Sequence, residues 1–163
     1  MDNKKEKIAD FKTAISSTVR SLSNSEKIEV SFGNENSKSG ANSIKLPELN
    51  PIKNKINYNQ IRAIADSKSL RHRFSDPKIF KMYEPEGNIS KQLYKISEKI
   101  RCEKIGTSYF KGVKNNIETF YQERVSGLDL KSSEDKIVES FENYFRTKFL
   151  DFENNNEIDK KLK

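Results

Sequence analysis

The feature that most constrains this fold is the recurrence of apolar side chains three or four residues apart along several segments. In the first of these, residues 5–22, the recurring side chains are Ile8, Phe11, Ile15, Val19 and Leu22. Such spacing places them on one face of an α-helix. Similar stripes predict helices over 58–74, 89–124 and 132–152. The fold class is therefore predicted to be mainly α.

Segment 89–124 leaves two alternatives open. It carries two apolar stripes, with Gly106 between them. A glycine permits either a kink in one long helix or a close approach between two helices. In both cases Gly127 is the expected stop.

Two helix starts are marked by side chains that accept hydrogen bonds from free backbone N–H groups. Asp76 followed by Pro77 predicts an N-cap and a first helical residue of a short helix that ends near residues 85–87. Ser132 with Asp135 resembles a capping box and predicts the start of the last helix.

A small β-hairpin is predicted after the first helix, at about residues 27–46. Residues 27–32 alternate apolar and polar side chains, which is typical of a strand. A loop rich in Gly, Asn and Ser follows, and Ile44 and Leu46 begin a return strand that Pro47 stops.

The expected organisation is one α-rich domain over residues 1–152, because a chain of 163 residues suits a single domain. Residues 47–57 contain two prolines and no periodicity, so they are expected to be an extended linker. Residues 153–163 are polar and are expected to form a frayed tail.

The composition limits the cellular compartments and the kinds of binding partner that are expected. No apolar run approaches the ~18 residues of a membrane span, the N-terminus lacks a signal-peptide pattern, and one cysteine allows no internal disulfide; a cytoplasmic location is expected. The net charge of +7 raises nucleic-acid binding as an alternative function. Of the 31 basic residues, however, 24 are Lys, and abundant Lys and Asn also result from AT-rich coding.

The motifs predict no catalysis by this chain alone. There is no glycine-rich phosphate loop, and one histidine and one cysteine are too few for a zinc site of that type. Four further residues are interpreted as structural or surface residues. For Cys102 the alternative is an activated thiol, and for His72 it is a pH switch. For Glu84 and Glu86 the alternative is acid–base chemistry.

An aromatic stripe follows the last helix, formed by Phe141, Phe145, Phe149 and Phe152. This spacing places the rings on one face, so they are predicted to pack in the core or against a partner helix, with base stacking as the alternative.

Three stretches, taken in order, resemble a known family. The first is 28–33 with 44–48, the second is 61–67 with 70–71 and 76–77, and the third is 101–106 with 110–113 and 116–117. Their order and separation resemble the N-terminal region of the CobT-type subunit of aerobic, ATP-dependent cobaltochelatase, over about residues 8–128.

The resemblance implies a non-catalytic adaptor role. In the family, an AAA+ ATPase subunit and a large corrin-binding subunit act with the CobT-type subunit to insert cobalt(II) into hydrogenobyrinic acid a,c-diamide in cobalamin biosynthesis. ATP, Mg²⁺ and cobalt would serve the complex, and this chain would bind none of them. The expected partners are those two subunits, with no membrane and no nucleic acid.

The matching stretches also imply candidate partner-binding residues: Arg62, Asp66, Arg71, Asp76, Arg101, Glu103 and Gly106. No catalytic and no metal-binding residue is expected. Two features depart from the family pattern. In the family, an acidic linker and an integrin-like domain follow the N-terminal region. The sequence ends at Lys163 without them, so the chain is expected to be a fragment, a split gene product or a shortened relative. Phe74 and Ser75 stand where family members usually carry a histidine.

Overall fold

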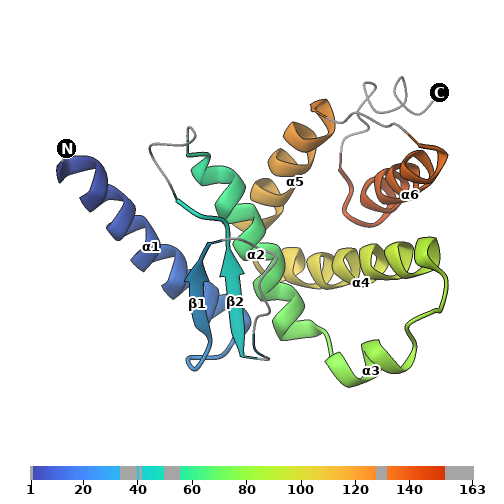
Figure 1. Cartoon of the computed structure of the whole chain (residues 1–163), viewed down its shortest axis with the longest axis horizontal. Coiled ribbons are helices and arrows are strands. Elements are labelled where there is room, and N and C mark those ends of the chain that lie inside the picture. Colours follow the sequence, from blue (N-terminus) through green and yellow to red (C-terminus); the bar gives the residue numbers. More distant parts are fainter. Residues whose placement is uncertain (1, 34–39, 41, 50–55, 128–131, 153–163) are drawn as a thin grey trace. The chain divides into compact units, whose positions relative to one another are not determined.

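The computed structural model of the chain describes residues 2–33, 40, 42–49, 56–127 and 132–152 (Figure 1). In chain order these residues form α1 (Asp2–Ser23), β1 (Glu29–Phe32), β2 (Ser43–Leu46), α2 (Tyr58–Phe74), α3 (Pro77–Met82), α4 (Asn88–Tyr109), α5 (Lys111–Ser126) and α6 (Ser133–Phe149). The predicted mainly α class, with two short strands after the first helix, is confirmed.

The chain divides into two compact units, Met1–Arg73 and Phe74–Lys163. Each is described by itself below, as the first unit and the second unit. The expectation of a single domain over residues 1–152 stays a prediction. Most of the expected linker, at 50–55, and the expected tail, at 153–163, lie outside the described residues.

In the first unit, α1 and α2 pack with the two strands around an apolar cluster (Figure 1). Its buried members are Ile15, Val19, Ile28, Ile44, Leu46, Leu49, Ile61 and Ala65. Leu49 falls within the expected linker, yet only 6% of it is exposed, so the apolar core continues past the end of β2.

The predicted hairpin is wrong in its strand direction, because β1 and β2 run parallel. Val30 lies opposite Ile44 and Phe32 opposite Leu46. A tight turn can join antiparallel strands. Parallel strands need a longer connection, which carries the chain back to the end of the sheet where the first strand began. The connection over 33–42 is long enough for this return, since a four-residue strand spans only ~13 Å and each extended residue reaches up to ~3.6 Å.

Polar side chains of α2 connect it to β2 and to α1 in the first unit. Lys68 of α2 donates to the carbonyl of Lys45 in β2 at 2.7 Å, and Arg73 donates to the carbonyl of Leu22 in α1 at 3.3 Å. Asn24, just after α1, has φ of 53°, a left-handed conformation that commonly ends helices and that Asn tolerates.

The second unit contains α3 to α6, and its capping signals are confirmed. The Asp76 carboxylate accepts from the N–H groups of Lys78 and Ile79, with Pro77 in the first turn of α3. Ser132 and Asp135 form the capping box of α6. Gly127 caps the end of α5.

The open alternative for 89–124 is settled as two helices, α4 and α5. The break lies at Phe110, whose extended backbone ends α4 and begins α5. Gly106 is four residues earlier, buried inside α4. A glycine is therefore not what breaks the helix here.

Candidate interaction surface

A groove of about 350 Å³ lies between α4 and α6 of the second unit. Its lining comprises Ser97, Ile100, Arg101, Lys104 and Ile105 from α4 and Phe145 and Phe149 from α6. Of these lining residues, Ile100 is 1% exposed and Phe149 is 49% exposed. We refer to this feature as the α4–α6 groove.

The α6 wall of the groove is aromatic. The ring centroids of Phe141 and Phe145 lie 4.3 Å apart, and those of Phe145 and Phe149 lie 5.0 Å apart. These residues are four apart in sequence, so their side chains stack along one face of the helix. Tyr144, which is 58% exposed, extends this apolar surface.

The α4 wall carries two charged lining residues, Arg101 and Lys104, and both are cations. Arg101 donates two hydrogen bonds to the Glu98 carboxylate, at 2.7 and 2.8 Å, and one to the carbonyl of Phe74 at 2.6 Å. The hydrogen bond with Glu98 raises the pKa of Arg101, so its charge is permanent. Lys104 lies 3.4 Å from the Asp151 carboxylate.

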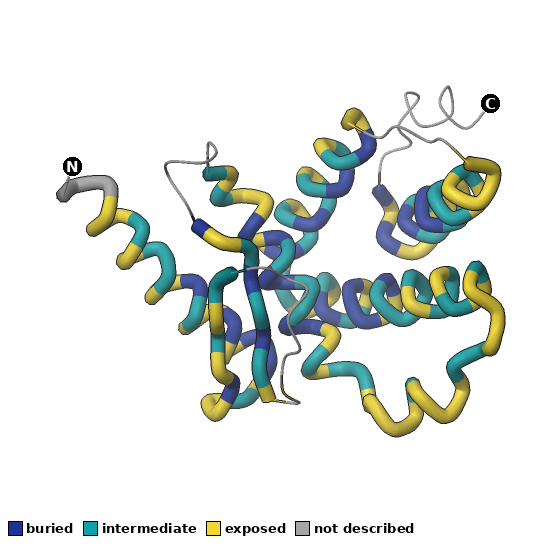
Figure 2. The backbone as a smooth tube through the Cα atoms, in the orientation of Figure 1, coloured by how far each residue is buried: buried dark blue, intermediate teal, exposed yellow. Residues whose placement is uncertain are grey.

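Buried ionic contacts hold the two walls together. Arg146 of α6 donates to Glu103 of α4 at 2.7 Å and to Glu142 at 2.9 Å. The side chains of Arg146 and Glu103 are 2% and 0% exposed. The buried residues of α6 are Glu142, Asn143 and Arg146, and Figure 2 shows the buried parts of this helix in dark blue.

The ionic contacts continue from Glu142 to α5 and α4. Arg124 donates to both oxygens of Glu139, at 2.7 and 3.0 Å, and to Glu142 at 3.0 Å. Lys99 lies 3.8 Å from Glu142. We refer to Lys99, Glu103, Arg124, Glu139, Glu142 and Arg146 as the ionic network.

The network sets the charge states of its members. Burial acts to raise the pKa of Glu142, but Arg146, Lys99 and Arg124 outweigh it and the pKa is lowered. Burial acts to lower the pKa of Arg146, but Glu103 and Glu142 outweigh it and the pKa is raised. Both side chains are therefore charged at neutral pH.

Aromatic rings complete the environment of Arg146. Its guanidinium lies 4.7 Å from the ring centroid of Tyr121 and 5.8 Å from that of Phe152, within the range of cation–π attraction. Burial and the charge of Glu142 raise the pKa of the Tyr121 hydroxyl, which has no hydrogen-bond partner among the described residues.

The comparisons with known proteins agree with the resemblance. The model of the family described as cobalamin biosynthesis protein CobT matches residues 5–139, which is most of the chain. The chain belongs to the CobT family. The family links it to cobalamin biosynthesis. No solved structure matches the chain.

The CobT match covers only part of the groove. It includes all of α4, with Arg101 and Lys104, but it ends at residue 139. The aromatic wall formed by Phe145 and Phe149 lies beyond it, as does Arg146.

Four of the residues predicted from the CobT resemblance lie in the second unit. Arg101 lines the groove, and Glu103 is a fully buried partner of Arg146. Gly106 is buried within α4, and Asp76 caps α3. Asp76 and Glu103 thus have structural roles, while partner binding at all four positions stays a prediction.

The other three predicted residues lie on α2 in the first unit. Arg62 is exposed, with its guanidinium 5.7 Å from the ring centroid of Phe11. Arg71 is exposed, whereas Asp66 is only 3% exposed. Their role in partner binding also stays a prediction.

Sequence reasoning missed Lys104, Glu142 and Arg146. The last two are four residues apart on one helix, which is the spacing of a helical ion pair. That spacing was a usable signal for the pair. It gave no indication that the pair is buried, because charged side chains usually lie on the surface.

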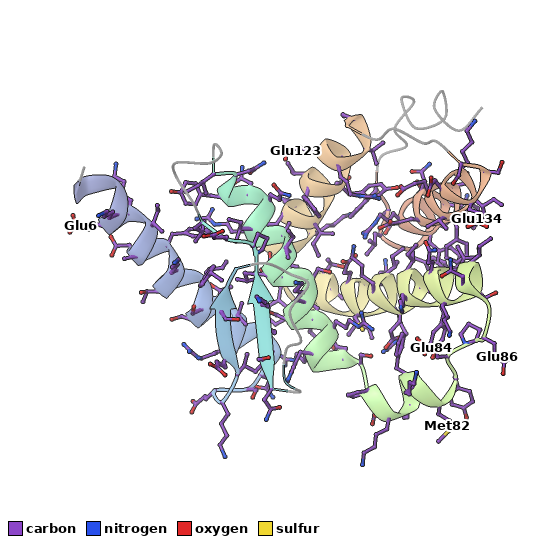
Figure 3. All side chains as sticks on the ribbon, in the orientation of Figure 1. Glu6, Met82, Glu84, Glu86, Glu123 and Glu134 are labelled. Atoms are coloured by element: carbon purple, nitrogen blue, oxygen red, sulfur yellow. The ribbon has the colours of Figure 1, made fainter. Side chains whose placement is uncertain are left out.

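The remaining candidate residues have structural surroundings. Cys102 is fully buried, with its sulfur 3.8 Å from Glu98. Nδ1 of His72 is buried without a hydrogen-bond partner among the described residues. Figure 3 shows Glu84 and Glu86 near the turn between α3 and α4. The hydrogen bond from Lys81 lowers the pKa of Glu84, opposite to the raised pKa of a general acid.

The described residues contain neither a metal-binding cluster nor a helix that could span a membrane. No group of three or more His, Cys, Asp or Glu side chains within them is placed to hold a metal ion. Within the same part of the chain, no helix combines the length and the apolar character that crossing a membrane requires.

Proposed function

We propose that this chain is a non-catalytic adaptor subunit of an ATP-dependent cobaltochelatase. In this role it helps to insert cobalt(II) into hydrogenobyrinic acid a,c-diamide in the cytoplasm. The partners are an AAA+ ATPase subunit and a large corrin-binding subunit, which bind ATP, Mg²⁺, cobalt and the corrin ring. The match to the CobT family over residues 5–139 carries this proposal.

The second unit supports an adaptor role, because it combines an exposed docking feature with a fixed frame. Large exposed apolar side chains, such as Phe149 and Tyr144, are typical of interaction surfaces. The buried bonds between Arg146, Glu103 and Glu142 hold α4 and α6 in one arrangement. An adaptor transmits a change only if its surface prefers one state of the partner, and a fixed frame favours such a preference.

A reconstitution with one component left out tests the proposal. The ATPase subunit, the large subunit, cobalt(II), ATP, Mg²⁺ and the diamide substrate are mixed with and without the chain, and cobalt insertion is followed by corrin absorbance. We expect insertion only when the chain is present. Equal rates with and without the chain would rule out the adaptor role.

Co-purification then separates docking from nucleic-acid binding, the alternative raised by the net charge of +7. The tagged chain should retain the ATPase subunit, and added ATP should change the amount retained. Phosphate binding to a DNA probe would instead weaken steeply with added salt. Salt-sensitive DNA binding without retention of either subunit would favour the alternative.

A further inference from the structure

We propose that the α4–α6 groove binds an amphipathic helix that carries acidic residues beside two large apolar side chains. This inference deepens the proposed docking function and rests on it, because it gives the chemistry of the partner segment. Three properties of the groove support it: its apolar lining, its charge and its shape.

The apolar lining indicates that the occupant has large apolar side chains. Ile100 and Ile105 lie on one wall, and Phe145 and Phe149 lie on the other. About half of Phe149 remains exposed, at 49%, so an occupant can remove further aromatic surface from water. Partly exposed aromatic side chains in grooves are typical anchors of protein–protein contacts.

The charge of the lining indicates that the occupant is acidic. Among the described residues, the charged side chains that line the groove are Arg101 and Lys104, and no carboxylate of these residues lines it. The Nη1 donors of Arg101 make no hydrogen bond within the described residues, so a carboxylate can accept from them. The Lys104 ammonium lies 3.4 Å from the Asp151 carboxylate, and the two side chains are 47% and 73% exposed. A surface ion pair of this kind exchanges partners at little cost in free energy.

The shape of the groove favours a helix over an extended strand. Both walls are helices, so the lining offers no row of free backbone groups for strand addition. Phe145 and Phe149 are separated by one helical turn, a rise of ~6 Å. A partner helix with apolar side chains four residues apart presents them at the same interval.

The buried ionic contacts preform this site. Glu103 of α4 and Arg146 of α6, joined at 2.7 Å, connect the two helices that form the walls. Because the walls are already held, a ligand does not have to order them on binding, and less of the binding free energy is lost.

Peptide selection tests the proposal with the full chain. One display library fixes Leu or Phe at positions i and i+4 of a helical peptide and places Asp or Glu at the remaining positions. A matched library places Lys or Arg at those remaining positions. We expect enrichment from the acidic library only. The enriched peptides are then measured by fluorescence anisotropy against the chain and its variants.

Two groove variants and two controls locate the binding. Phe149→Ala should weaken binding about tenfold, and Lys104→Glu about threefold to tenfold, more strongly at low salt. Tyr109→Ala removes a ring that is 73% exposed on α4 outside the lining. Lys111→Glu reverses an exposed charge on α5. Both controls should bind like the parent, and circular dichroism should show the same helix content in all four.

Two results would overturn the inference. Equal enrichment from the acidic and basic libraries would remove the charge preference. Unchanged affinity in both Phe149→Ala and Lys104→Glu would place the binding elsewhere. Neither result affects cobalt insertion in the reconstituted system, and a failed reconstitution leaves the peptide measurements unaffected, so the two proposals fail separately.

Discussion

The interiors of the two units differ in kind. The first unit is held by an apolar cluster, in which Val19 and Leu46 are completely buried. The second unit also buries apolar side chains, but its last helix turns Glu142, Asn143 and Arg146 inward. The first interior therefore depends mainly on non-directional burial, with Asp66 as its one buried charged side chain among the described residues. The second adds a group of three, Glu103, Glu142 and Arg146, which pair with one another.

This difference implies different responses to change. Apolar burial contributes ~25 cal/mol per Å² whatever the exact geometry. Burying a charge costs free energy of desolvation, and the attraction to a partner of opposite charge offsets this cost. Removing the partner therefore destabilises the fold. The second unit should therefore be the more sensitive to single substitutions and to pH.

The largest expected effect is that of Arg146→Met. This change leaves Glu103 and Glu142 buried without their main partner, and breaking such a contact costs about 3–5 kcal/mol. Urea unfolding followed by circular dichroism measures the total loss. Hydrogen exchange should show that amides of α4 and α6 lose more protection than those of β1 and β2.

The matched control is Lys148→Met, which removes an exposed cation from the same helix and should change stability by less than about 0.5 kcal/mol. A triple variant with Glu103→Leu, Glu142→Leu and Arg146→Met sharpens the comparison, since apolar replacement of a buried ion group is often neutral or stabilising. If Arg146→Met alone were as stable as the parent, the two interiors would not differ in the way described.

The first unit was the more predictable from sequence, because there the periodic residues are the buried ones. The predicted stripe on α1 supplied Ile15 and Val19 to the core, and the strand pattern supplied Ile28, Ile44 and Leu46. The strand direction was not predictable. The alternation of apolar and polar side chains shows which residues share one face of a strand. It does not show whether the strand pairs with its neighbour in the parallel or the antiparallel direction.

In the second unit the same reasoning gave the helix but not its buried face. Of the predicted aromatic stripe, Phe152 is buried, whereas Phe141 and Phe145 are only partly buried and Phe149 is exposed. The charged side chains on the adjacent face of α6 are buried. Periodicity shows which residues share a face and does not show which face is covered. Pairing across 43 residues, as between Glu103 and Arg146, leaves no local pattern.

The candidate site was predictable to a similar extent. The resemblance singled out Arg101, and the aromatic stripe supplied Phe145 and Phe149, yet nothing in the sequence placed them in one groove. Their meeting depends on the packing of α4 against α6. Lys104 was missed because one more lysine has no distinctive spacing in a chain with so many.

The second expected effect is that of Leu46→Ala in the first unit. Removing this fully buried side chain should cost about 3 kcal/mol, within the range for core truncations. Urea unfolding at pH 7 and pH 4 should give the same loss, because no titrating group is removed. Glu48→Ala, an exposed change nearby, is the control. A loss that depended strongly on pH would contradict an apolar interior.

The smallest and most specific effect concerns the acid sensitivity of the second unit. The pKa of Glu142 is lowered below 4.5 in the folded chain, despite its burial, chiefly by Arg146. The unfolded chain therefore binds a proton more readily, and the contribution of Glu142 to stability is present above about pH 4.5 and is lost as the pH falls further.

Replacing Glu142 with Gln removes this titration. The free energy of unfolding of Glu142→Gln should be lower than that of the parent at pH 7, and it should fall less steeply between pH 4.5 and pH 3. Glu134→Gln, at an exposed position in the first turn of α6, should retain the parent's slope. If Glu142→Gln kept the same slope, the pKa of Glu142 would not be lowered in the folded chain. The contrast between an ionic and an apolar interior would then rest on Glu103 and Arg146 alone.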